Sequence, residues 1–362
     1  MTERLGSGLQ NRPRQFESAW HLFKDTYSTI ECVSLNLKES MKTSNTRSSN
    51  FELLRIVSMI LIVLHHMLIA TGQIDYSKNG KLLGGEMVNG FAIVGVNCFI
   101  LISGYFGIRF RLSKLFYLLY AIAFVCFITF LLSLVLPLYF DYAYVQKTLI
   151  PIHHKANWFI PTYIGLMILS PLINKGLVSL SREETTKLVI SLTLFNIYAF
   201  ASSLSAINPN GYTLIQFIYL YIVGAYIRQL PKSIPLWLPL TGYLACSIGT
   251  GIYARYVHTG FQAYAYNNPI VLLGSLCLFL AFKQIQLQNV LINKIAETTF
   301  IVFLFHYSLL QHIKDTAFGH PLQHAAYLSM LCVFIFFMAF LLSAAITPSF
   351  AFLSCLIRRL RP

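Results

Sequence analysis

Residues 51–66 of the chain read Phe51-Glu52-Leu53-Leu54-Arg55-Ile56-Val57-Ser58-Met59-Ile60-Leu61-Ile62-Val63-Leu64-His65-His66, a hydrophobic run with very little charge. An α-helix turns by about 100° per residue, so the step from Arg55 to His66 completes three turns plus roughly 20° and rises about 16 Å. The guanidinium and the imidazole therefore lie on one stripe of the predicted helix, with Glu52 near the stripe and His65 off it. Ionisable residues inside a membrane span are costly and usually face a protein interior or a wet cavity. The pair is our first candidate for a functional site.

Composition places the chain among membrane proteins. Of its 362 residues, 56% are hydrophobic and only 11% are charged, and so few charges cannot cover the aqueous surface of a soluble globule. The net charge of +14 comes from short basic runs between apolar spans, a pattern typical of cytoplasmic loops that does not favour nucleic-acid binding. The seven cysteines include no CxxC pair. We expect them to be small buried hydrophobes, and we expect no disulfide framework and no metal site.

Counting about 20 apolar residues per span predicts an all-α, polytopic membrane protein with about ten transmembrane helices. The predicted spans cover approximately residues 51–72, 88–108, 114–137, 157–174, 186–206, 212–229, 235–256, 268–283, 295–313 and 325–354. When the loops are assigned to alternate sides, 21 of the 27 basic residues fall on the side of the N-terminal tail. The positive-inside rule therefore predicts that both termini are cytoplasmic.

The two ends differ from the membrane domain predicted over residues 51–356. Residues 1–50 form a polar extension without a cleavable signal peptide. Two interpretations of this extension stay open: a cytoplasmic tail or surface helix, or a true translation start at Met41 followed by the short basic lead that precedes a first span. Residues 357–362 are expected to be a basic cytoplasmic tail.

This topology assigns depths to the ionisable residues. Arg55 is expected near the cytoplasmic face, and His66 at or beyond the midplane, where His306 of the ninth span has a similar depth. Arg109 and Arg111 follow the second span at its inner mouth and could join Arg55 in one basic cluster. Such guanidinium groups would suit a polyphosphorylated donor, for example a nucleotide-containing thioester. Alternatively, Arg109 and Arg111 only mark topology and extend to lipid phosphate.

The histidines and an outer tryptophan also allow two interpretations each. An intramembrane histidine can be a hydrogen-bonding core residue, or it can move a proton between a hydroxyl and a leaving group or carry an acyl group. His65 is expected to pack beside His66, although exchanged roles stay open. Trp158 is either an aromatic-belt anchor or a platform for a sugar ring. The small residues from Gly95 to Gly104 predict close helix contact and not a dinucleotide fingerprint.

An ordered set of motifs now resembles the acyltransferase-3 family, which consists of membrane-embedded bacterial acyltransferases that modify surface carbohydrates. The resemblance covers roughly residues 50–356. It rests on the Arg-x10-His pair of the first span and on the segments 94–106, 157–163, 171–174 and 298–306. Two positions depart from the family pattern. Asn97 stands where many members look acidic, and the basic pair is Arg109-Phe110-Arg111 where some members have Arg-x-x-Arg.

The resemblance implies transfer of an acetyl or other short acyl group from cytoplasmic acyl-CoA to a hydroxyl of a surface or lipid-linked glycan. The reaction would take place at the outer face of the bacterial inner (plasma) membrane, with acyl-CoA as donor substrate, no tightly bound cofactor and no metal. Since no esterase-like domain follows the tenth span, the chain is similar to the stand-alone form. The residues expected to take part are His66 and Arg55 for catalysis, Arg109, Arg111, Ser103 and Glu52 for acyl-donor binding, and His306, Trp158, Asn157 and Tyr163 on the acceptor side.

Two other classes of function use the same features. A carrier or flippase for a glycan precursor or a small anion would bind its cargo with the same buried charges. The sequence shows no inverted repeat, which argues against a carrier. A structural or regulatory membrane protein would leave the Arg55 and His66 stripe unexplained.

Overall fold

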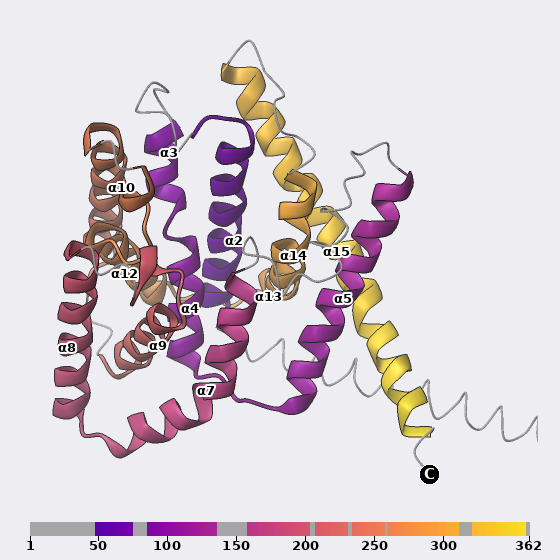
Figure 1. Ribbon diagram of the computed structural model, residues 1–362, viewed down its shortest axis with the longest axis horizontal. Coiled ribbons are helices and arrows are strands. Elements are labelled where there is room, and N and C mark those ends of the chain that lie inside the picture. Colours follow the sequence, from indigo (N-terminus) through magenta and orange to yellow (C-terminus); the bar gives the residue numbers. More distant parts are fainter. Residues whose placement is uncertain are drawn as a thin grey trace, which may run out of the picture. The chain divides into compact units, whose positions relative to one another are not determined.

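The computed structural model describes residues 48–74, 85–135, 158–202, 207–230, 234–257, 260–310 and 321–359. Every regular element in these ranges is helical, as the sequence predicts (Figure 1). The α-helices are α2 (Ser49–Ala70), α3 (Gly85–Ala92), α4 (Gly95–Phe106), α5 (Leu112–Val135), α7 (Phe159–Ser179), α8 (Arg182–Ala201), α9 (Leu214–Gln229), α10 (Trp237–Val257), α11 (Gly260–Ala263), α12 (Pro269–Gln284), α13 (Val290–Glu297), α14 (Thr299–Leu310) and α15 (Pro321–Arg359), and a 3-10 turn, η2, covers Pro209–Gly211.

Four apolar helices in the described ranges are long enough to cross a membrane. They cover Ser49–Ala70, Gly85–Phe106, Leu112–Leu131 and Cys332–Ser354. With so few charged residues in the chain, these helices make the protein a membrane protein. Helical segments also occur at the other predicted spans, and the crossing of the bilayer by ten spans and the cytoplasmic position of both termini stay predictions.

Two predicted spans are interrupted. In the second, α3 ends at Ala92 and α4 begins at Gly95; in the ninth, α13 and α14 meet at Thr298. The hydroxyls of Thr298 and Thr299 donate to the carbonyls three residues earlier, at 2.8 and 2.7 Å. Such local bonds compete with the regular helical ladder, and this competition explains the break in the ninth span.

The last helix is longer than predicted. α15 runs through Pro348 without a break, beyond both ends of the predicted span 325–354. Residues 48–343 form one compact unit, and residues 344–359, the C-terminal part of α15, belong to a second one. All candidate site residues that the structure describes lie in the first unit.

Capping explains where several helices begin. Ser181 and Glu184 form a capping box at the start of α8, in which each side chain bonds the other residue's backbone N–H. These hydrogen bonds from Ser181 lower the pKa of the Glu184 carboxyl. Asn268 and Asn289 cap α12 and α13 more simply, through side-chain oxygens that accept from backbone N–H groups of the first turn.

Glycines bring α4 against its neighbours at backbone distance. A Cβ atom on Gly104 would collide with the carbonyl of Tyr221 on α9, and one on Gly224 of α9 would collide with the carbonyl of Leu101. On the α2 side, a Cβ on Gly95 would lie 2.7 Å from the Ser58 carbonyl oxygen. These distances confirm the close helix contact expected of this small-residue segment. In lipid, such van der Waals packing between backbones holds helices together.

Gly104→Ala is expected to destabilise the protein, because the added methyl group would push α4 and α9 apart. Overpacking of this kind costs about 1–3 kcal/mol, which should lower the midpoint of thermal unfolding in detergent. Gly176→Ala on α7 is the matched control, since its Cβ would meet no atom within 4 Å. If both variants melt at the same temperature, the close contact of α4 with α9 is wrong.

Candidate active site

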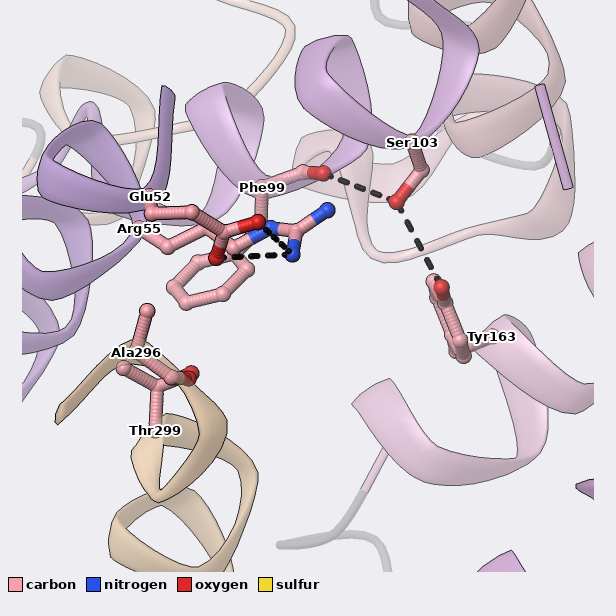
Figure 2. A network of polar contacts seen from close by, with 7 residues as sticks. All are labelled: Glu52, Arg55, Phe99, Ser103, Tyr163, Ala296 and Thr299. Atoms are coloured by element: carbon pink, nitrogen blue, oxygen red, sulfur yellow. Dashed lines mark hydrogen bonds and ion pairs between the residues drawn. The ribbon is translucent and has the colours of Figure 1, made fainter. Parts of the chain in front are cut away.

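An ion pair occupies the N-terminal part of α2. Arg55 Nη1 donates to both carboxylate oxygens of Glu52, at 3.0 Å each (Figure 2). The Glu52 side chain is only 7% exposed, whereas that of Arg55 is 31% exposed. A carboxylate so deeply buried is costly without a positive partner. Glu52 therefore holds the guanidinium in place while one side of it stays accessible.

Ser103 of α4 and Tyr163 of α7 lie in the same polar region as this pair (Figure 2). The Ser103 hydroxyl donates to the Phe99 carbonyl at 3.0 Å and lies 3.4 Å from the Tyr163 hydroxyl. The sequence assigned Ser103 to the donor side and Tyr163 to the acceptor side. The structure brings the two hydroxyls together, so both belong to one neighbourhood.

His66 and His306 meet between α2 and α14. His306 Nε2 lies 3.3 Å from His66 Nδ1, the two ring centroids are 5.1 Å apart, and His306 is 1% exposed. Matching depths for the two histidines were expected from the topology. This contact confirms that expectation across 240 residues of sequence.

Backbone carbonyls assign the protons of this histidine pair. His66 Nδ1 lies 2.9 Å from the Ile62 carbonyl, and His306 Nδ1 lies 3.0 Å from the Val302 carbonyl. A carbonyl oxygen only accepts, so in the neutral rings both Nδ1 atoms carry the proton and both Nε2 atoms carry a lone pair. The His66 Nδ1–H thus faces two acceptors, the Ile62 carbonyl and His306 Nε2. Nε2 of His66 is then the basic atom of the pair.

His65 points to a different partner. Its Nδ1 lies 2.6 Å from Oδ1 of Asn89 on α3, and its ring centroid is 5.1 Å from that of His66. Both His65 and Asn89 are buried. This arrangement favours a packing and supporting role for His65 over a direct part in proton transfer.

Aromatic rings surround Trp158. The indole centroid lies 4.5 Å from that of Tyr212, 5.5 Å from Tyr266 and 5.7 Å from Phe217. These contacts pack Trp158 against protein, unlike a belt anchor whose ring faces lipid. Asn157, the neighbouring acceptor-side candidate, lies outside the described residues.

A line of ring contacts leads from the Ser103 neighbourhood to the histidines. Tyr163 stacks on Phe159 at 5.7 Å, Phe159 contacts Phe303 at 4.8 Å, and Phe303 contacts His306 at 5.8 Å. α7 and α14 thus supply a row of aromatic rings that runs from the Ser103 neighbourhood to His306.

Asn97 of α4 has a structural role. Its amide donates to the Tyr266 carbonyl at 3.0 Å and to the Ser275 hydroxyl at 3.2 Å. Gln216 of α9 donates to the same Tyr266 carbonyl at 3.1 Å. An ionised carboxylate could not donate these bonds. The neutral amide therefore fixes the backbone of Tyr266, whose ring contacts Trp158.

Arg109 lies in a pocket of about 460 Å³ at the ends of α4, α7 and α9. Asn174, Arg228 and Gln229 also line this pocket. Arg111 does not, although it is exposed just before α5. Arg109 therefore shares a pocket with Arg228, whereas Arg55 pairs with Glu52. A joint cluster of Arg55, Arg109 and Arg111 stays a prediction. Arg228 is not among the site residues predicted from the sequence, although its place in the last turn of a predicted span was an available signal.

The described side chains offer little for metal chemistry. They contain no group of three His, Cys, Asp or Glu residues that could hold a metal ion. The cysteines at positions 98, 126, 246, 277 and 332 are free thiols.

Comparison with protein families gives one match. The acyltransferase-3 family model, whose description is acyltransferase domain, matches residues 48–349. This range contains every candidate site residue named above. Neither the comparison with curated proteins nor that with solved structures gave a match.

Glu52→Gln is expected to lower thermal stability in detergent, because it leaves the Arg55 guanidinium without its buried partner. The loss should be about 2 kcal/mol, as for other hydrogen bonds to charged groups. Glu183→Gln is the matched control, since the Glu183–Lys187 pair is also within one helix but has 78% and 72% exposed side chains. It should change stability very little. Equal shifts in the two variants would show that the Glu52–Arg55 pair is not a buried one.

Proposed function

The chain belongs to the acyltransferase-3 family and is an acyltransferase, and from this premise we propose that it transfers an acetyl or other short acyl group from cytoplasmic acyl-CoA to a glycan hydroxyl. The transfer would occur at the outer face of the bacterial inner membrane, on a surface or lipid-linked glycan. The observation that carries the proposal is the contact between His66 and His306. It provides an oriented base inside an apolar region.

Proton transfer follows from the assigned tautomers. The acceptor hydroxyl oxygen attacks the thioester carbonyl carbon, and His66 Nε2 takes the hydroxyl proton. The carbon–sulfur bond then breaks, and the same proton passes from Nε2 to the thiolate, which leaves as free CoA. His306 accepts from His66 Nδ1–H and so orients the imidazole and stabilises its positive charge, as the third member of a catalytic triad does. An acyl-histidine relay would use the same nitrogen as nucleophile.

The separation along α2 suits a long donor. Arg55 and His66 are about 16 Å apart along the helix axis. In CoA, a flexible pantetheine arm separates the phosphates from the thioester. The phosphates can therefore remain near the arginine end while the thioester reaches the histidines. This fit supports Arg55, with Glu52, Ser103 and the arginines at the α4 end, as the donor side.

The acceptor side is proposed at the histidine end of α2. Trp158 and its aromatic neighbours offer flat rings on which a sugar can stack. Phe159 and Phe303 connect this group of rings to His306. A sugar near Trp158 would therefore be connected to the histidine pair through the rings of Phe159 and Phe303.

His66→Gln is expected to abolish acyl transfer, with a loss of about 10²–10⁴-fold, because the base is removed. His306→Gln should cost less, about 10-fold, since only the orientation of the base is disturbed. The measurement uses purified protein in liposomes, labelled acetyl-CoA and a panel of soluble oligosaccharides, with label in sugar and released thiol as readouts.

His65→Gln is the matched control for these variants and should keep most of the activity, because His65 bonds Asn89 instead of the pair. Activity that survives His66→Gln but is lost in His65→Gln would reverse the assignment. Movement of sugar across the liposome membrane without acylation would favour the carrier.

A further inference from the structure

The pocket at the ends of α4, α7 and α9 contains an arginine that the donor site predicted from sequence did not include. Arg109 and Arg228 both line it, and Asn174 and Gln229 add amide groups. None of its lining residues, all of which the structure describes, is acidic. Two guanidinium groups without a carboxylate beside them favour a ligand with at least two negative charges. The volume of about 460 Å³ suits a small-molecule site.

A clasp of two side chains holds the backbone next to Arg109. The Ile108 N–H donates to the Tyr221 hydroxyl at 2.8 Å, and Asn174 Nδ2 donates to the Ile108 carbonyl at 3.0 Å. The Tyr221 hydroxyl in turn donates to Asn174 Oδ1 at 2.7 Å. Both polar groups of Ile108 are thus bound. Gly107, with φ +75°, allows the turn that presents this backbone to the clasp.

A buried lysine fixes the other side of the pocket. Lys283 of α12 is 3% exposed, and its Nζ donates to the carbonyls of Ile227 and Leu230 at 2.9 Å each. These two carbonyls flank Arg228 at the C-terminal end of α9. A positive charge there also complements the helix dipole. Lys283 therefore fixes the C-terminal end of α9 and, with it, the backbone that carries the Arg228 side chain.

We propose that Arg228 is a second phosphate-binding residue of the donor site, opposite Arg109, and that it binds the nucleotide phosphates of acyl-CoA. Asn174, Tyr221 and Lys283 act as positioning residues, because they hold the backbone on which the two arginines stand. The inference rests on the proposed function, since it takes acyl-CoA as the donor. A guanidinium binds phosphate through two parallel hydrogen bonds, which an ammonium group cannot do. The pocket includes Gly104, next to Ser103, so it adjoins the Arg55 neighbourhood along α4.

Binding of CoA and of pantetheine to the full-length protein in detergent tests the proposal without any need for acyl transfer. Pantetheine carries the thiol arm but no nucleotide phosphates. Arg228→Gln should raise the Kd for CoA about 10-fold, the usual effect of one lost hydrogen bond to a charged group, and should leave pantetheine binding unchanged. The Kd of Arg228→Lys for CoA should lie between those of the wild type and of Arg228→Gln. Arg182→Gln is the control, since Arg182 is an exposed arginine on the predicted cytoplasmic side and does not line the pocket.

Kinetics test the positioning residues. Tyr221→Phe removes the hydroxyl that accepts from Ile108, so the KM for acetyl-CoA should rise several-fold while turnover of acetyl-pantetheine stays unchanged. If Tyr221 had a purely structural role, Tyr221→Phe would lower the turnover of acetyl-CoA and of acetyl-pantetheine equally. Lys283→Met should likewise raise the KM for acetyl-CoA and leave the turnover of acetyl-pantetheine unchanged.

Three results would overturn the proposal. The first is an equal Kd for CoA in Arg228→Gln and Arg182→Gln. The second is an equal loss of CoA and pantetheine binding in Arg228→Gln. The third is a lipid effect: phosphatidylglycerol nanodiscs stabilise the wild type more than phosphatidylcholine nanodiscs do, but do not stabilise Arg228→Gln, while the Kd for CoA is the same in both proteins. This result would assign the pocket to a lipid headgroup. Tight CoA binding through Arg228 without transfer to any sugar would support this site and contradict the proposed function.

Discussion

Contact between bare backbones along α4 is the constraint on which the candidate site depends. Apolar side chains gain nothing by leaving lipid for other apolar side chains, so helices in a membrane associate where small residues allow close approach. Gly104 and Gly224 provide such an approach between α4 and α9, and Gly95 provides it toward α2. α4 consequently joins the helix that carries Arg55 and His66 to the helix that carries Arg228.

Polar groups inside this packing are paired in ways that also support the site. Glu52 bonds Arg55, Asn97 bonds the Tyr266 carbonyl, and Lys283 bonds the end of α9. In a bilayer an unpaired polar group costs several kcal/mol, roughly, since no water is available. Each pairing therefore also fixes the position of a neighbouring element. Stability and preorganisation of the site come from the same hydrogen bonds.

Chemistry is divided along α2. Its charged end has an anchored guanidinium with one accessible side, and its other end has a histidine pair with assigned protons. Aromatic rings of α7 and α14 contact one another in a row that leads toward the histidine pair. A donor with phosphates at one end and a reactive ester at the other matches this division. This match is the physical basis of the proposed reaction, and it gives Arg55 and His66 distinct roles on one mostly apolar helix.

The sequence by itself determined the helical fold class, the membrane character, the family, and the stripe that joins Arg55 to His66. The fold class, the membrane character and the stripe depend on composition and on helix periodicity, which are local properties, whereas the family follows from an ordered set of motifs. It also predicted equal depth for His66 and His306, because depth follows from counting residues along spans. Only the tertiary structure decided which side chains meet across helices. The grouping of Arg109 with Arg228, the contact of Ser103 with Tyr163 and the clasp of Asn174 on Ile108 depend on how each helix is rotated about its axis. That rotation is set by glycine contacts and buried hydrogen bonds between residues far apart in the chain, which no local pattern encodes.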